Sequence, residues 1–280
     1  MSIFIDAHVH IYPIFSIDQL LSAALRNFKH QARLLKDTES RDYVLCLTEG
    51  TGFNVFSQLF QMAVMPQDQK KNESLPAADR WQYHRTSDQQ CLRAVNRAGE
   101  SVYIVAGRQL ISRENLELLS LGVSVNVADK VFSLEMLAGK VWDSGGIPVL
   151  PWGVGKWLGK RGKVINHYIS TKHDFPVVLG DNGNRPVFWP LPRQFSSALQ
   201  MQCCFLAGSD PLPLADHYQR VGTYGGWIAG HQLSMQYPTE DLKALVTRPD
   251  CLNSFGKNMD TYQFFRDQLV VNLKKRLSRR

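Results

Sequence analysis

Short apolar runs, many of them β-branched, recur along the chain, and most are followed by a stretch with apolar residues at helical spacing. This alternation of strand and helix patterns predicts a parallel sheet covered by helices. We expect strands at residues 3–5, 42–49, 102–111, 123–127, 147–151, 176–181 and 203–210. Seven strand–helix units favour a (β/α) barrel, distorted or seven-stranded, over an open doubly wound sheet. The first strand is not followed by the Gly-x-Gly-x-x-Gly motif of dinucleotide-binding folds, which supports the same choice.

Helical spacing and capping residues predict the connecting helices. Ser16 can cap a helix that buries Leu20, Leu21 and Phe28, and Ser133 can cap a second that ends near the Gly145-Gly146 pair. Further helices are expected at residues 55–64 and 116–121, and from about Gly162 and Arg193. The Tyr224-Gly-Gly-Trp227 sequence is expected to form a loop.

Two segments depart from the strand–helix rhythm of this single predicted domain, residues 1–280. Residues 66–99 begin with a polar stretch and then carry hairpin-like runs around 81–86 and 91–95, so we expect an insertion near the barrel mouth. Residues 238–280 show two helical patterns and no strand, which predicts a C-terminal helical extension. Apolar residues gather near one face of its last helix, which is expected to pack on the barrel: Phe264, Phe265, Leu269, Leu273 and Leu277.

Composition and charge are those of an ordinary globular protein, with 44% hydrophobic and 20% charged residues. A net charge of +7 by itself suggests nucleic-acid binding, but most of this charge comes from a few clustered residues. Five of the basic residues lie in the last seven positions, and removing them leaves +2: Lys274, Lys275, Arg276, Arg279 and Arg280. A basic helix end suits the negative pole of the helix dipole, so nucleic acid is not an expected partner.

Neither a bilayer-spanning run nor a secretory leader is apparent, which predicts a cytoplasmic protein with no membrane partner. The five cysteines form no Cys-x-x-Cys pair, and an odd number of them favours reduced thiols over a disulfide framework. A homo-oligomer is compatible with the sequence.

The sequence Asp6-Ala-His-Val-His10 carries the clearest chemical signal. On a strand, side chains alternate between faces, so Asp6, His8 and His10 share one face. Two imidazoles at that spacing can bind one cation, and this is how a metal site begins at the end of a barrel strand. The alternative is a histidine pair without a ligand. Six other histidines, His217 among them, lie at no predicted strand end and are expected on helices or at the surface.

Carboxylates at other predicted strand ends could complete the site. Asp210 ends the last strand and would neighbour the first on closure, so it could bind the metal and accept a proton from water; alternatively it caps the next helix. Glu49 could be a further metal ligand or a helix cap. Asp181 could be a second catalytic carboxylate or part of a Gly-Asp-Asn-Gly turn.

Basic and aromatic residues on the same rim predict an anionic small-molecule substrate. Lys156, Arg161 and Arg185 could bind a carboxylate or phosphate group. Trp152 and Asn182 lie beside them in the sequence and could line the pocket, although the tryptophan loops could equally form a packed lid.

The Asp-x-His-x-His motif and Ser209-Asp210 resemble the amidohydrolase superfamily and the related polymerase-and-histidinol-phosphatase metallophosphoesterases, whose barrel has seven strands. The resemblance implies a hydrolase that binds metal through His8 and His10, with Asp210 binding metal or activating water. The chain departs from both families. Strands five and six lack terminal histidines, and Pro211-Leu212 replaces the usual Asp-x-His ending. One zinc, manganese or iron ion is therefore expected rather than two.

These features predict a metal-dependent hydrolase that acts on a small anionic substrate through a metal-activated water. The alternative is a non-catalytic or metal-depleted barrel that binds an anionic ligand or a partner protein.

Overall fold

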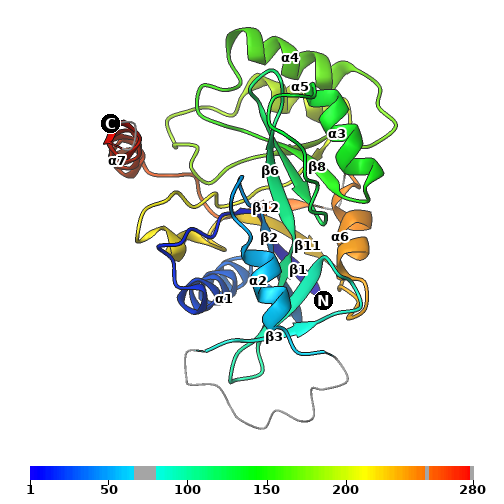
Figure 1. Ribbon diagram of the computed structural model, residues 1–280, viewed down its shortest axis with the longest axis vertical. Helices are drawn as coiled ribbons and strands as arrows, with labels where there is room; N and C mark the ends of the chain where they lie inside the picture. Colours follow the sequence, from blue (N-terminus) through cyan, green and yellow to red (C-terminus); the bar gives the residue numbers. More distant parts are fainter. Residues whose placement is uncertain (66–79, 250–251, 278–280) are drawn as a thin grey trace.

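The computed structural model describes residues 1–65, 80–249 and 252–277, whose strands form two mixed sheets (Figure 1). The larger sheet contains β1 (Ser2–Val9), β2 (Arg41–Leu47), β3 (Gln82–Arg85), β4 (Cys91–Val95), β5 (Ser101–Val105), β11 (Gly225–Ala229) and β12 (Asn253–Phe255), in the order β12-β11-β1-β2-β5-β4-β3. The smaller contains β6 (Gly107–Ile111), β7 (Glu117–Leu121), β8 (Ile147–Pro151), β9 (Val178–Gly180) and β10 (Cys204–Phe205), in the order β10-β9-β8-β7-β6.

Helices connect and cover these strands. They are α1 (Ile17–Leu34), α2 (Val55–Met62), α3 (Leu134–Asp143), α4 (Gly159–Ser170), α5 (Arg193–Gln200), α6 (Pro238–Val246) and α7 (Thr261–Leu277). Ser16 and Ser133 cap α1 and α3 as predicted, since their hydroxyls accept hydrogen bonds from the N–H groups of Gln19 and Met136. None of these helices is both long and apolar enough to cross a bilayer.

Strand directions in both sheets are mixed rather than uniformly parallel. In the larger sheet β1, β2 and β5 are parallel, while β11 and β4 run antiparallel to β1 and β5, respectively. In the smaller sheet β8, β9 and β10 are parallel, and β7 is antiparallel to both β6 and β8. The prediction of a parallel strand–helix repeat therefore holds only at the centre of each sheet.

In the part of the chain that the structure describes, the predicted α/β class is confirmed, but a closed barrel is not seen: the strands are arranged in two mixed sheets. The sheets still meet at two places. Glu49, just after β2, forms a bridge with Arg108 in β6, and the Ala7 N–H in β1 donates to the Ala207 carbonyl at 3.1 Å. The carboxyl end of β1 therefore lies where both sheets come together.

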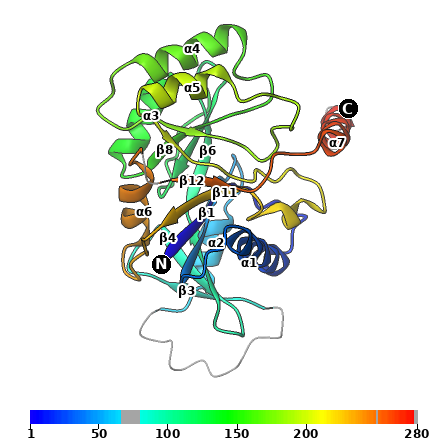
Figure 2. The same cartoon turned by 180° about the vertical axis from the view of Figure 1, so that it is seen from behind.

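Three apolar layers hold this arrangement. One core packs the larger sheet against α1 and α2, with Phe4 and Phe28 fully buried. A second lies between the two sheets and includes Ile5 and Val149, and a third packs the smaller sheet against α3, α4 and α5. Figures 1 and 2 show these two groups of helices on opposite sides of the paired sheets. Residues 3–7 of β1 alternate between the first two cores, and the register shift before Val9 then places Val9 in the first.

Several predicted elements need correction. The expected strand at 102–111 is two strands in different sheets, β5 and β6. At their junction a Cβ on Gly107 would lie 2.3 Å from the Leu47 carbonyl oxygen, so the close approach to β2 requires glycine. Residues 116–121 form β7 rather than a helix, because pairing with β6 and β8 overrides their helical spacing. Residues 123–127 are irregular; Val123, Val125 and Val127 are partly buried against the third core.

The segments after residue 220 and the insertion also differ from expectation. Residues 225–229 are β11, not a loop, and the C-terminal extension includes the short strand β12. Both hairpin strands of the predicted insertion are present as β3 and β4, at the edge of the larger sheet, whereas residues 66–79 lie outside the described residues.

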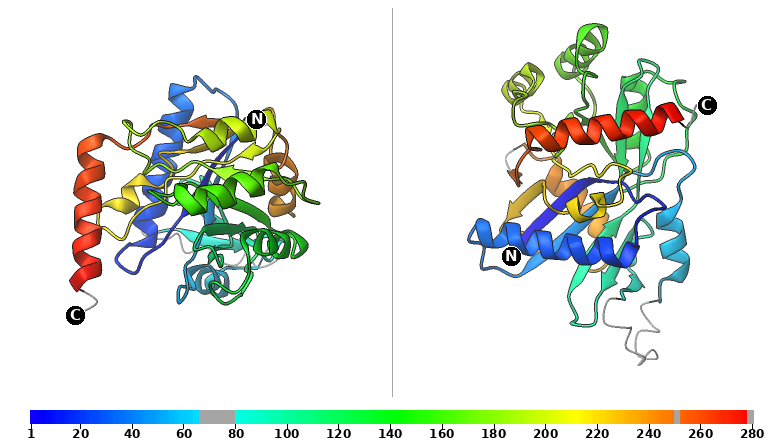
Figure 3. Two further views of the ribbon diagram at one scale, coloured as in Figure 1. Left: turned by 90° about the horizontal axis from the view of Figure 1, so that it is seen from above. Right: turned by 90° about the vertical axis from the view of Figure 1, so that its left-hand side faces the viewer.

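The last helix packs by a face other than the predicted one. Figure 3 shows α7 along one side of the molecule. Phe264 and Asp267 are buried, whereas Phe265, Leu269 and Leu273 are 60%, 61% and 48% exposed. The expectation that these three residues pack on the body of the protein is therefore wrong.

Candidate metal centre

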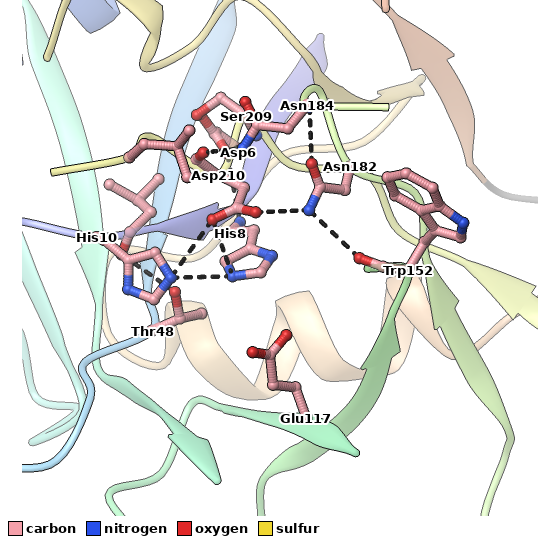
Figure 4. A network of polar contacts seen from close by, with 12 residues as sticks. Asp6, His8, His10, Thr48, Glu117, Trp152, Asn182, Asn184, Ser209 and Asp210 are labelled. Carbon is pink, nitrogen blue, oxygen red and sulfur yellow. Dashed lines mark hydrogen bonds and ion pairs between the residues drawn. The ribbon is translucent and has the colours of Figure 1, made fainter. Parts of the chain in front are cut away.

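His8 and His10 lie at the carboxyl end of β1 with their rings on the same side, as their spacing predicts. Both are buried, and their Nε2 atoms are 3.1 Å apart (Figure 4). The register of β1 against β2 shifts between Asp6 and Val9, which is where His8 lies. Neighbouring segments therefore fix both imidazoles next to each other.

Asp210 completes the cluster from the segment that follows β10. Its Oδ1 atom lies 3.6 Å from His8 Nε2 and 3.5 Å from His10 Nε2. Within the described residues, these three side chains have ligand atoms close enough to share one metal ion. The predicted proximity of Asp210 to the two histidines is confirmed, although the sheets that bring them together do not form the expected barrel.

The three ligand atoms fit a small divalent cation. They form a triangle with edges of 3.1, 3.5 and 3.6 Å. A point equidistant from its corners lies about 2 Å from each, which is the length of zinc–nitrogen and zinc–oxygen bonds in proteins. Two imidazoles and one carboxylate are donors that zinc, manganese and iron accept, and three protein ligands leave a coordination position open.

The backbone around Asp210 is held in an uncommon conformation. Asp210 has φ of 48°, in the left-handed region, and its N–H donates to the His8 carbonyl at 2.8 Å. Asn182 Nδ2 donates to Asp210 Oδ2, and Asn184 Nδ2 donates to the Asp210 carbonyl, both at 2.5 Å. Gly208 permits the close approach to β1, because a Cβ there would lie 2.3 Å from the His8 nitrogen. The carboxylate is thus fixed toward the histidines from several directions.

The environment of His10 keeps its imidazole neutral. Burial and the nearby His8 charge lower the pKa of His10 to about 4, against the opposing effects of Asp210 and of hydrogen bonds to the Thr48 backbone and the Gln109 side chain. A neutral imidazole is the form that binds metal. The hydrogen bond to the Thr48 backbone also orients the ring, as second-shell partners of metal-binding histidines do.

The carboxyl group of Asp210 is ionised in this setting. Burial acts to raise its pKa, but His8, His10 and the two asparagines lower the pKa of Asp210 below its ordinary value. The site therefore offers an anionic oxygen beside two ring nitrogens.

The predicted shared strand face is wrong for Asp6: the register shift between Asp6 and Val9 places Asp6 on the same face as Val9, toward the first core, where it has a structural role. Its Oδ1 accepts hydrogen bonds from the N–H groups of Ser209 and His8, at 2.8 and 3.3 Å, and its Oδ2 accepts one from Gly222 at 2.8 Å. Burial raises the pKa of Asp6 to about 6 despite these bonds. This carboxylate ties β1 to the segment that carries Asp210 and to the loop before β11.

The other two predicted site carboxylates do not reach the cluster. Glu49 Oε1 accepts hydrogen bonds from the N–H groups of Val55 and Phe56, so it caps α2, the alternative that the sequence left open. Asp181 accepts two hydrogen bonds from Arg185 and one from the Tyr224 hydroxyl, at 2.5 Å. Neither side chain is placed as a metal ligand, and Asp181 is not placed as a proton acceptor at the cluster.

The predicted substrate-binding cations are engaged within the protein. Lys156 forms an ion pair with Glu117, and Arg185 is buried in its pairing with Asp181. Arg161 donates to the carbonyls of Gly155 and Asn115 at 3.1 and 3.5 Å. These side chains do not gather into the shared anion site that the sequence suggested.

Trp152 and Asn182 lie next to the cluster as predicted, but in supporting positions. Trp152 is 2% exposed, and its carbonyl accepts a hydrogen bond from Asn182 Nδ2 at 3.3 Å (Figure 4). Asn182 thereby connects the tryptophan loop to Asp210.

Sequence reasoning missed two residues beside the cluster. The Glu117 carboxylate, on β7, faces His8 and His10 (Figure 4) and also pairs with Lys156. Tyr12 packs its ring against His10, and burial together with the charges of Asp210 and Glu117 raises the pKa of Tyr12. A strand assignment for residues 117–121 would have revealed Glu117; the helical spacing concealed it.

His217 was expected at the surface and is instead 1% exposed. Its Nδ1 accepts a hydrogen bond from the Leu212 N–H, and its Nε2 lies 3.0 Å from Asp267 Oδ2. Because Leu212 follows Asp210 closely, this contact anchors the segment after the cluster to α7.

Comparisons with known proteins support the fold alone and assign no function to the chain. Neither a protein-family model nor a curated protein matches the chain. The crystal structure of PsfC from Pseudomonas syringae PB-5123 is similar over 98% of both chains, with a TM-score of 0.54 and 15% sequence identity. This likeness, together with the two mixed sheets, overturns the expected resemblance to the amidohydrolase and polymerase-and-histidinol-phosphatase barrels.

Proposed function

We propose that the protein is a hydrolase that depends on one divalent cation bound by His8, His10 and Asp210. The observation that carries this proposal is the triangle of ligand atoms, whose edges suit a cation about 2 Å from each atom. A cation held by three protein groups with an open position supplies a water of lowered pKa to the reaction.

The chain's own residues would prepare the site in four ways. Burial holds His10 neutral, and the paired asparagines fix Asp210 toward the ring nitrogens. Glu117, which faces the cluster and also pairs with Lys156, would take the proton-accepting role that the sequence had suggested for Asp181. The Tyr12 ring closes one side against His10 and limits the access of bulk water.

One observation favours a second function, non-catalytic binding. A cavity of about 790 Å³ lies away from the ligand atoms of the cluster, lined by Trp152, Trp157, Trp189 and Arg193 among others. A largely apolar cavity with one arginine suits a small organic molecule that carries an anionic group. In that case the histidine cluster would be structural.

Elemental analysis together with cleavage assays separates the two functions. Wild type should purify with, or take up on reconstitution, about one zinc, manganese or iron ion per chain. The variants His8→Ala and Asp210→Ala should lose it, while His30→Ala, at an exposed histidine, should retain it. Metal-dependent cleavage of phosphoesters, esters or amides by the wild type alone would support hydrolysis. Wild-type protein that remains metal-free after reconstitution would overturn the proposal.

A further inference from the structure

A groove of about 670 Å³ lies beside the candidate metal centre. One wall is the loop between β2 and α2, and the other is the irregular segment 125–129. The end of β2 and β6 contribute its remaining lining. The lining residues include Phe53, Arg108, Gln109, Leu110 and Val127. It is therefore part apolar and part polar, as pockets for small organic molecules are.

Two contacts connect this groove to the cluster. The Gln109 side chain lines the groove and is hydrogen-bonded to His10. Phe53, also in the lining, packs edge-on against Tyr12, whose ring lies against His10. The groove therefore adjoins the side of the cluster on which His10 lies, with Gln109 and Tyr12 between them.

Three charged residues line the groove: the carboxylates of Glu49 and Asp129 and the guanidinium of Arg108. The Glu49 carboxylate is taken up by the N–H groups at the start of α2, and Asp129 is an exposed residue of the opposite wall. Arg108 donates from Nη1 to the Phe53 carbonyl at 2.7 Å, and among the residues that the structure describes it forms no ion pair. Its remaining guanidinium donors carry a positive charge beside the apolar lining.

We propose that this groove holds the organic part of the substrate and that Arg108 binds an oxyanion group of it, a phosphate or a carboxylate. The inference rests on the proposed hydrolase function and assigns the substrate class to the same site. A guanidinium whose position is fixed by one hydrogen bond keeps further donors in a planar fork that matches an oxyanion. Lys156 and Arg185 are less suited, because each already has a carboxylate partner.

Anion titration of the metal-loaded protein tests this assignment. Binding of inorganic phosphate and, separately, of succinate is measured by calorimetry on wild type, Arg108→Gln and Arg113→Gln. Arg113 is the matched control: it lies beyond β6, donates to the Val131 carbonyl at 2.8 Å and does not line the groove. Metal content is determined for each protein.

We expect one of the two anions to bind wild type and Arg113→Gln equally, and to bind Arg108→Gln about tenfold or more weakly, with metal content unchanged. Which anion responds distinguishes a phosphate-bearing from a carboxylate-bearing substrate. Equal affinities in all three proteins, or no binding to wild type, would overturn the assignment. If the wild type lacks metal, the hydrolase proposal is refuted, but the role of Arg108 is still tested. The same anion titration, carried out on the metal-free proteins, then decides whether Arg108 binds an anion.

Discussion

The Glu49 carboxylate accepts a hydrogen bond from the backbone N–H of Phe56 at 3.0 Å, in the first turn of α2. It also accepts one from Val55, and the N-cap residue Asn54 makes no side-chain cap of its own. Glu49 therefore satisfies the free N–H groups of a helix start, where negative charge is stabilising. The sequence predicted Glu49 as a metal ligand, but its carboxylate caps the N-terminus of α2 instead.

Replacing Glu49 should consequently affect stability and not metal binding. We expect Glu49→Ala to lower the free energy of unfolding by about 1–2 kcal/mol, the usual cost of losing a helix cap, with unchanged metal content. Urea denaturation and elemental analysis of the same preparation measure both quantities. Loss of the metal from a folded Glu49→Ala protein would restore Glu49 to the ligand set.

The sequence revealed the part of the site that depends on local spacing. The spacing of His8 and His10 brings their two rings together, whereas the register shift between Asp6 and Val9 turns Asp6 to the other face of the strand. Asp210 followed from the expectation that the last strand returns to the first, which the Ala7–Ala207 contact confirms. These two arguments needed only strand geometry.

Residues whose position depends on distant partners were not predicted. Glu117 was hidden because the leucines around it fit a helix, and only pairing with β6 and β8 makes that segment a strand. His217 is buried by Asp267, fifty residues later, which no local pattern encodes. The division into two mixed sheets was not predicted for a similar reason: strand count predicts neither the direction of β7 nor the break at Gly107.

A cation that binds the cluster should stabilise the folded protein. Only the folded chain brings His8, His10 and Asp210 together, so binding to the native state adds about 2.7 kcal/mol at a metal concentration of one hundred times Kd. Thermal unfolding of wild type should shift upward with added zinc and return with a chelator. His10→Ala should show no shift, whereas His30→Ala should behave as wild type. An equal shift in His10→Ala would place the zinc elsewhere.

The pKa of His10 gives the metal-free protein a defined pH dependence. Burial, with the His8 charge, lowers the pKa of His10 to about 4, below its ordinary value of 6.5. The unfolded chain therefore binds a proton more readily, and this stabilisation is present above pH 6.5 and lost as the pH falls toward 4. The expected loss attributable to His10 is about 2–3 kcal/mol between pH 7 and pH 4.5.

The variant His10→Gln isolates this effect. The raised pKa of Asp6 acts in the opposite direction, since its protonated form is favoured in the fold, but that contribution is common to both proteins. Urea denaturation in the presence of a chelator should show wild type losing more stability than His10→Gln between the two pH values. Equal losses would mean that His10 is not held neutral by its surroundings.

The contact between His217 and Asp267 should anchor α7 to the body of the protein. Burial and the Arg220 charge lower the pKa of His217, and its Nδ1 accepts the Leu212 N–H, so the neutral ring carries its proton on Nε2 and donates it to Asp267. Asp267 also lies 3.8 Å from Arg220. Asp267→Ala would leave a buried imidazole N–H and a largely buried guanidinium without their carboxylate.

We expect Asp267→Ala to lower the free energy of unfolding by about 3 kcal/mol, the cost of breaking a buried charged pair. Asp216→Ala is the matched control, because Asp216 is 57% exposed and pairs with Arg266 at 3.4 Å, a contact worth less than about 1 kcal/mol. Limited proteolysis should cut α7 faster in Asp267→Ala than in Asp216→Ala. Since Leu212 follows Asp210 closely, metal affinity should fall with the first substitution and not the second. Equal stability and equal cleavage of the two variants would show that α7 is held by its apolar contacts, such as those of Phe264, rather than by the buried carboxylate.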